Sequence, residues 1–134
     1  MKCRIIVLLI FMNIVPADGN ETANIVHKAE TKIKSGDISG GKKILFDTLS
    51  DSGNLPDSEK AEIDNKIAWF YDEIVGNYPY AQRYSRKVIQ YSLPPSHYTV
   101  IESSNRIKKL RQLAARYHKE NMTGPAICLK LRQD

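Results

Sequence analysis

The sequence is poor in the residues that interrupt helices and in those that cross-link small proteins. Its 134 residues include only 7 glycines, 6 prolines and 2 cysteines. Cys3 and Cys128 are too few for a disulfide-rich scaffold, and Cys128 would stand alone if the first residues were removed. Few glycines and prolines leave room for helices of ordinary length. The length suits one domain with a modest core.

No apolar stretch is long enough to cross a bilayer as a helix. The most apolar one, Ile5–Val15, has eleven residues and would span about 16 Å, roughly half of a bilayer core. Two basic residues precede it, a proline follows, and small residues allow cleavage after Ala17 or Gly19, as in an export signal. We therefore expect a signal peptide over residues 1–19 and a secreted or periplasmic protein. A buried N-terminal core helix and an uncleaved anchor are the alternatives.

The remaining chain has helical periodicity and no alternating strand pattern. Apolar residues recur at intervals of three and four in stretches that are separated by turn signals. The stretches predict helices over residues 21–35, 39–49, 57–75, 79–91 and 98–120, with Ser39 as the cap of the second. The expected fold is all-α, with about five helices stacked as antiparallel hairpins in a domain over residues 20–121. A tail over 122–134 follows.

Two helices carry apolar stripes whose orientation can be predicted. In GNYPYAQRYSRKVIQYSLPP, residues 76–95, Tyr80, Tyr84 and Tyr91 share a stripe with Ala81 and Val88. We expect these tyrosines to pack, with their hydroxyls at the edge of the core. The expected buried stripe of the last helix is Ile101, Ser104, Ile107, Leu110, Leu113, Ala114 and Tyr117.

The two helix pairs over residues 22–95 repeat a pattern of small and apolar residues. The residues that carry it are Ala29, Gly36, Asp37, Gly41, Leu45 and Thr48 in the first copy, and Ala68, Ala81, Tyr84, Val88 and Pro94 in the second. This pattern resembles the tetratricopeptide repeat, whose period is 34 residues. Here the copies are 39 residues apart between Ala29 and Ala68, with the excess largely in the 50–58 loop. A generic array of helical hairpins is the alternative.

The resemblance implies a concave groove lined by the first helix of each pair. By register from Ala68, the groove positions are Glu62, Asn65, Trp69, Asp72 and Glu73. Asn65, Trp69 and Asp72 share one helical face, so they are the expected partner-binding residues. An alternative for Trp69 is simple packing against a neighbouring helix.

Charge is distributed unevenly along the chain. Residues 20–77 hold 7 Lys/Arg against 11 Asp/Glu, a net charge of −4, and residues 78–134 hold 11 against 3, a net of +8. Arg83, Lys87, Arg106 and Lys109 are therefore candidate anion-binding residues for acidic lipid or a polyanion, chiefly through the helix at 98–120. A solvated helix face is the plain alternative. No nucleic acid partner is expected for an exported protein.

Catalytic and metal-binding patterns are lacking. The three histidines, His27, His97 and His118, have no metal-ligand spacing, and no phosphate-binding glycine loop or nucleophile elbow is present. We therefore expect no enzyme activity, no metal and no cofactor. The expected function is binding of a protein or peptide partner, with binding to an anionic surface as the alternative.

Overall fold

The computed structural model describes residues 20–119. The predicted signal peptide over 1–19 and the tail over 122–134 lie outside the described residues. The α-helices are α2 (Glu21–Lys34), α3 (Ile38–Ser50), α4 (Asp57–Trp69), α5 (Tyr78–Gln90) and α6 (Tyr98–Lys119), and a π-helical segment, η1 (Phe70–Val75), continues α4. Every regular element between residues 20 and 119 is helical, which confirms the all-α prediction.

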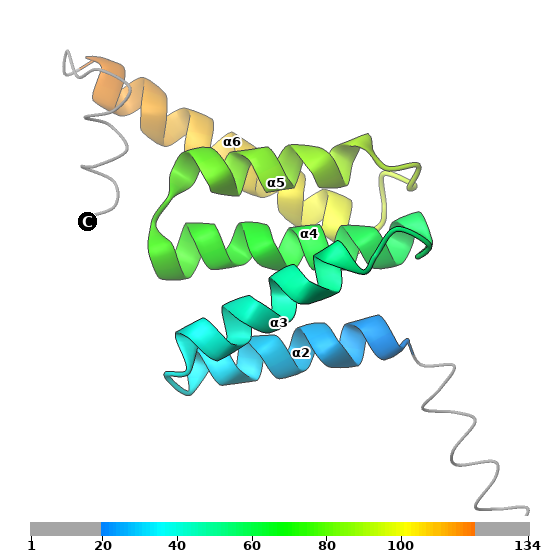
Figure 1. Ribbon diagram of the computed structural model, residues 1–134. Helices are drawn as coiled ribbons and strands as arrows, with labels where there is room; N and C mark the ends of the chain where they lie inside the picture. The colour runs from blue at the N-terminus through cyan, green and yellow to red at the C-terminus, as the bar shows by residue number, and fades with distance from the viewer. Residues whose placement is uncertain (1–19, 120–134) are drawn as a thin grey trace, which may run out of the picture.

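Helix α4 lies at the centre of the fold (Figure 1). It contacts α2 and α3 on one side and α5 and α6 on the other, and α2 packs on α3 as α5 packs on α6. Six of its thirteen residues are buried, among them the polar Asp64 and Asn65. A helix that is covered on several sides cannot keep a purely polar face, so α4 shows no clear amphipathic pattern.

Asparagine and aspartate side chains cap three helix starts. The carboxamide oxygens of Asn20 and Asn77 accept from the amides of Ala23 and Tyr80, at 3.0 and 3.3 Å, and open α2 and α5. Asp37 caps α3, since its carboxylate accepts from the Gly40 amide at 3.0 Å. The prediction of Ser39 as this cap was wrong, because the helix begins two residues earlier, with Asp37 as its cap.

The third predicted helix is continuous but changes its winding. Its last six residues form the π-helical η1, and Gly76 ends it with φ 72°. A wider turn shifts the side-chain phase by one residue. As a result Phe70 and Asp72 are both buried, whereas Ile74 is 37% exposed.

The main core lies between α2, α3 and α4. It consists of Val26, Ala29, Ile33, Leu45, Ile63, Ile67 and Phe70. Aromatic rings extend it toward α5. Tyr71 and Tyr84 stack at 5.8 Å between ring centres, and Phe46 meets both edge-on. The packing role expected of Tyr84 is confirmed, while Tyr80 touches Tyr71 but stays 45% exposed.

Helix α6 turns only part of the predicted stripe toward the core. Ile107 and Leu110 are buried as predicted, but so are the polar Thr99 and Ser103, whereas Ile101 is 47% exposed. Ser104 and Ala114, also expected in the stripe, are exposed, Leu113 is half-buried, and the side chain of Tyr117 lies outside the described part. The first part of the stripe was wrong because polar residues of α6 find partners on α4, as described below.

A close approach of α2 and α3 yields a first prediction. A Cβ at Gly41 would lie 2.6 Å from the Ala29 carbonyl oxygen and 2.4 Å from the Ile33 side chain. Overpacking costs about 1–3 kcal/mol and outweighs the gain in helix propensity of about 1 kcal/mol. Gly41→Ala should therefore lower the free energy of unfolding by about 1–2 kcal/mol, measured by urea denaturation.

Gly53→Ala is the matched control. A Cβ there meets nothing within 4 Å, and its φ is not positive. Its stability should change by less than about 0.5 kcal/mol. A stabilised Gly41→Ala variant would contradict the close approach of the two helices.

Candidate partner-binding site

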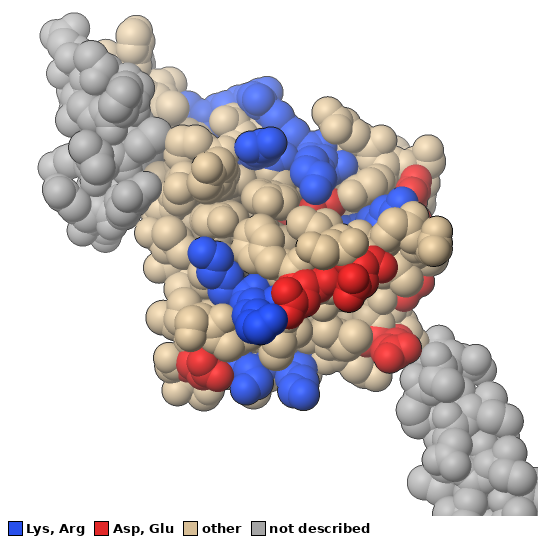
Figure 2. All heavy atoms as spheres, in the orientation of Figure 1, with Lys and Arg blue, Asp and Glu red and all other residues tan. Residues whose placement is uncertain are grey.

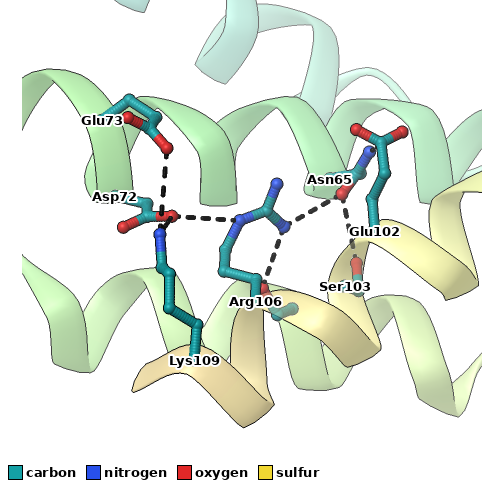
Figure 3. Close-up of polar contacts among 8 residues, drawn as sticks. Asn65, Asp72, Glu73, Glu102, Ser103, Arg106 and Lys109 are labelled. Atoms are coloured by element: carbon teal, nitrogen blue, oxygen red, sulfur yellow. Dashed lines mark hydrogen bonds and ion pairs between the residues drawn. The ribbon is translucent and has the colours of Figure 1, made fainter. Parts of the chain in front are cut away.

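Arg106 of α6 is the centre of a buried polar network between three helices (Figure 3). Its guanidinium donates to the Asn65 carboxamide oxygen at 3.0 Å and to the Ser85 hydroxyl at 3.1 Å. Ser103 donates to the same oxygen of Asn65 at 3.1 Å. The Arg106 side chain is only 10% exposed. Because Asn65 belongs to α4 and Ser85 to α5, one side chain links α6 to both helices.

Asp72 supplies the negative charge of this network. Its carboxylate lies 3.6 Å from Nε of Arg106 and accepts from Lys109 Nζ at 2.6 Å. Burial lowers the pKa of the Arg106 guanidinium, while Asp72, Glu102 and Glu73 act in the opposite direction. An arginine stays charged even so. Among the buried side-chain nitrogens and oxygens of residues 20–119, none lacks a hydrogen-bond partner, so each buried polar atom of the network has at least one.

A second polar contact joins α4 to α5. Asp64 is fully buried and accepts from Lys87 Nζ at 3.0 Å and from the Tyr91 hydroxyl at 2.5 Å. Burial, together with the hydrogen bond to Asp64, raises the pKa of the Tyr91 hydroxyl. Tyr91 therefore acts as a donor at any ordinary pH, and charge-assisted hydrogen bonds hold α4 to α5 as well as to α6.

The structure does not bring the three predicted partner-binding residues together on one open surface. Asn65 and Asp72 are 6% and 8% exposed and contact α6. Trp69 is half-buried against the main core, with the ammonium groups of Lys34 and Lys66 at 5.9 and 5.0 Å from its ring centre. Whether these residues meet a partner stays a prediction.

The four candidate anion-binding residues do not form one free cationic surface. Only Arg83 is exposed and makes no ion pair with another residue of the described part of the chain. Lys87 pairs with Asp64, while Arg106 and Lys109 pair with Asp72. Three of the four thus neutralise carboxylates of the same fold. Among residues 20–119, the exposed cations of α5 and α6 without an ion pair are Arg83, Arg86, Lys108, Arg111 and Arg116.

A hollow lies between α2, α4 and α6. Its volume is about 170 Å³, and its lining residues are Ala23, Val26, His27, Glu30, Glu62, Asn65, Lys66, Tyr98 and Glu102. Each of the three helices contributes one glutamate. We refer to this site as the α2–α4–α6 hollow.

The groove register of the tetratricopeptide resemblance also identifies residues of the first helix that line this hollow. The first and third helices can be aligned by placing Ala29 on Ala68. In this alignment the groove positions Glu62, Asn65 and Trp69 correspond to Ala23, Val26 and Glu30. Applying the groove register to the first helix as well as the third would have found the α2 wall. Glu102 and Tyr98 of α6 have no such marker, because the rotation of α6 depends on Arg106.

The carboxylates of the hollow differ in their surroundings. Burial opposes the charge of Glu30, but hydrogen bonds from Lys34 and Lys66 outweigh it and lower the pKa. Glu62 has no hydrogen bond from a lysine. Burial is the main cause that raises the pKa of Glu62, and the neighbouring Glu59 raises it further. Hydrogen bonds from the Tyr98 hydroxyl and Asn20 and the charge of His97 act against the shift. The site is thus a fixed, negatively charged depression with neutral donors at its rim.

The described residues contain no group of three or more His, Cys, Asp and Glu side chains that could hold a metal ion. No helix within residues 20–119 is both long and apolar enough to span a membrane. Comparison of the chain with protein-family models, curated proteins and solved structures finds no match.

The network around Arg106 yields a second prediction. Arg106→Met keeps the apolar stem but removes the Arg106 guanidinium from Asp72, Asn65 and Ser85. Lys109 still donates to Asp72 and Ser103 still donates to Asn65. Breaking a buried charged pair on one side costs about 3 kcal/mol, so the free energy of unfolding should fall by about this amount in urea denaturation. Arg111→Met, at an exposed position of the same helix, should change it by less than about 0.5 kcal/mol. Equal effects of the two variants would contradict the network.

Glu62 yields a prediction on pH. Since folding raises its pKa above 4.5, the folded state binds more protons than the unfolded state between 4.5 and the folded pKa. Stability therefore falls as pH rises through this window. The wild type should lose stability relative to Glu62→Gln as pH increases from about 4 to 7, measured by urea denaturation at each pH.

For Glu30 the expected pH dependence of stability has the opposite sign. Folding lowers its pKa below 4.5, so its contribution is present above that pH and is lost as pH falls. The wild type should therefore lose stability relative to Glu30→Gln on acidification. The same trend for both variants would contradict the assignment of their surroundings.

Proposed function

We propose that the chain is an exported, non-catalytic protein-interaction module that binds a protein or peptide partner. In this proposal the helices form stacked antiparallel hairpins resembling tetratricopeptide repeats, with α2, α4 and α6 as the first helices of successive pairs. The partner binds across these three helices, on the side where the α2–α4–α6 hollow lies. No reaction is assigned to the site.

The hollow itself is the observation that carries the proposal. Residues of three helices converge on it, although α2 and α6 are far apart in the sequence. Its floor is fixed, because Asn65 is held by Ser103 and Arg106. A preformed surface loses little conformational entropy on binding, which suits recognition of an extended segment.

The size of the hollow also favours a polypeptide over a small molecule. Sites for drug-sized ligands and cofactors commonly enclose about 300–1,000 Å³, whereas this one offers about 170 Å³. Such a volume fits one side chain of a longer ligand that continues over the neighbouring helices. Tyr98, 51% exposed, and Ile101, 47% exposed, provide apolar contact area next to it on α6.

A second candidate function is binding to an anionic surface. Lys and Arg side chains gather over α5 and the adjoining part of α6 (Figure 2). Arg83, Arg86, Lys108 and Arg111 are exposed and make no ion pair within residues 20–119. Their charges are available to phosphate groups of acidic lipids or to a polyanion. This candidate uses outward-facing residues, so the two functions can be separated by mutation.

Selection from a random peptide library displayed on phage tests the main proposal. The full chain should enrich peptides, and Ala23→Phe, which places a ring in the hollow, should weaken their affinity at least about tenfold, or 1.4 kcal/mol. Ala115→Phe, at an exposed position of α6 outside the hollow, should leave affinity unchanged.

A second arm of the experiment measures binding to vesicles of phosphatidylglycerol and phosphatidylcholine. If no peptide is enriched, vesicle binding would favour the anionic-surface function. That binding should be lost in 0.5 M salt and in the double variant Arg83→Glu, Arg86→Glu. Enrichment of peptides whose affinity is the same for wild type and Ala23→Phe would contradict the proposed site.

A further inference from the structure

The chain's own cations are distributed unequally among the three carboxylates of the hollow. Glu30 is 2.7 Å from Lys34 Nζ and 2.8 Å from Lys66 Nζ, so two ammonium groups serve one carboxylate. Among the described side chains, Glu62 and Glu102 make no ion pair with a lysine or arginine, and their hydrogen-bond partners are neutral groups. The charges of His97 and Arg106 act on Glu62 and Glu102 from farther away. Asn20 and Tyr98 donate to Glu62, and the Asn65 amide contacts Glu102.

The balance of charge in the hollow is therefore negative. Three carboxylates line it against one ammonium, that of Lys66, which is already engaged by Glu30. Glu62 is also partly desolvated and lies near Glu59. The Glu59 carboxylate accepts a hydrogen bond from the Thr22 hydroxyl at 2.7 Å. Like charges that share a partly buried site repel each other, and an added cation relieves this repulsion.

An independent feature of the floor points to a polypeptide ligand. Asn65 is 6% exposed and lines the hollow, and its carboxamide oxygen is fixed by two donors. Its amide nitrogen, which carries two N–H donors, has a single long contact of 3.5 Å, to Glu102 (Figure 3). The amide is thus held in place with donor capacity to spare, which a carbonyl group of a ligand would use.

We propose that the α2–α4–α6 hollow receives a lysine or arginine side chain of the bound peptide. The cationic group lies between Glu62 and Glu102, and the apolar stem lies along Val26, Ala23 and the Tyr98 ring. This inference rests on the proposed function and specifies its ligand class. Trp69 is not the cation receptor, because Lys34 and Lys66 already lie near its ring.

A metal ion is a poorer occupant than a basic side chain. The described residues contain no set of three ligands arranged for a metal, and calcium and magnesium ions need six or more oxygen ligands. A lysine ammonium needs three acceptors and an arginine guanidinium up to five. Two carboxylates from different helices, with the carbonyl groups of the peptide itself, meet that smaller need.

The peptides enriched from the phage library provide the probe. They should share at least one lysine or arginine position, and replacing that residue with glutamine should weaken affinity at least about tenfold. Glu62→Gln and Glu102→Gln should each weaken affinity for the parent peptide but have little further effect on the glutamine-substituted peptide. Such non-additivity identifies a direct contact.

Glu21→Gln is the matched control, because Glu21 is an exposed carboxylate of α2 outside the hollow. It should leave affinity unchanged. Glu62→Gln breaks no ion pair, so the variant is expected to fold, and its urea denaturation verifies this in the same sample.

The failures of the two proposals differ. Two outcomes would contradict the cationic ligand but not the binding function. In the first, the enriched peptides are sensitive to Ala23→Phe but share no basic residue. In the second, they bind Glu62→Gln and Glu102→Gln as tightly as wild type. If no peptide is enriched, the binding function fails and the cationic ligand fails with it.

Discussion

The arrangement of helices depends on how α4 is buried. Its residues face α2 and α3 through aliphatic side chains, and face α5 and α6 through Asp64, Asn65 and, one segment later, Asp72. A buried carboxylate is tolerated only when donors surround it. Lys87, Tyr91, Arg106 and Lys109 provide those donors. The positions of α5 and α6 are therefore set by charge-assisted hydrogen bonds as well as by packing.

This constraint links the basic C-terminal half of the chain to the acidic N-terminal half. The net charge is −4 over residues 20–77 and +8 over 78–134. Part of these opposite charges forms ion pairs between the two halves, since Lys87, Arg106 and Lys109 all contact carboxylates of α4 or η1. Other charged side chains of both halves make no such ion pair. Arg83 and Arg86 are exposed on α5, and Glu62 and Glu102 lie in the hollow.

Local signals in the sequence predicted the fold class and the helix limits well. Gly76, the 50–58 turn and the proline pair at 94–95 interrupt the helical pattern, and the helices begin and end within a few residues of them. Tyr84 packs as its spacing with Ala81 and Val88 suggested. Such features act over a few residues and can be read without knowledge of the neighbours.

The rotation of α6 and the nature of the site could not be predicted in this way. Ser103 and Arg106 would be placed on a solvated face by their polarity, yet they are buried because Asn65 and Ser85 receive their hydrogen bonds. The same partners turn Asn65 and Asp72 toward α6. The groove register from α4 contains two residues that line the hollow, Glu62 and Asn65, but it gives no sign of Tyr98 and Glu102. Partner binding by Asn65 stays a prediction.

The most direct measurement of this account is a double-mutant cycle between Asn65 and Arg106. The free energies of unfolding of the wild type, Asn65→Leu, Arg106→Met and the double variant give the coupling between the two side chains. The account predicts a favourable coupling of about 1 kcal/mol or more, as for residues in one hydrogen-bond network. A coupling of zero would mean that α6 is placed by its apolar contacts alone, and would contradict the central role of the polar network.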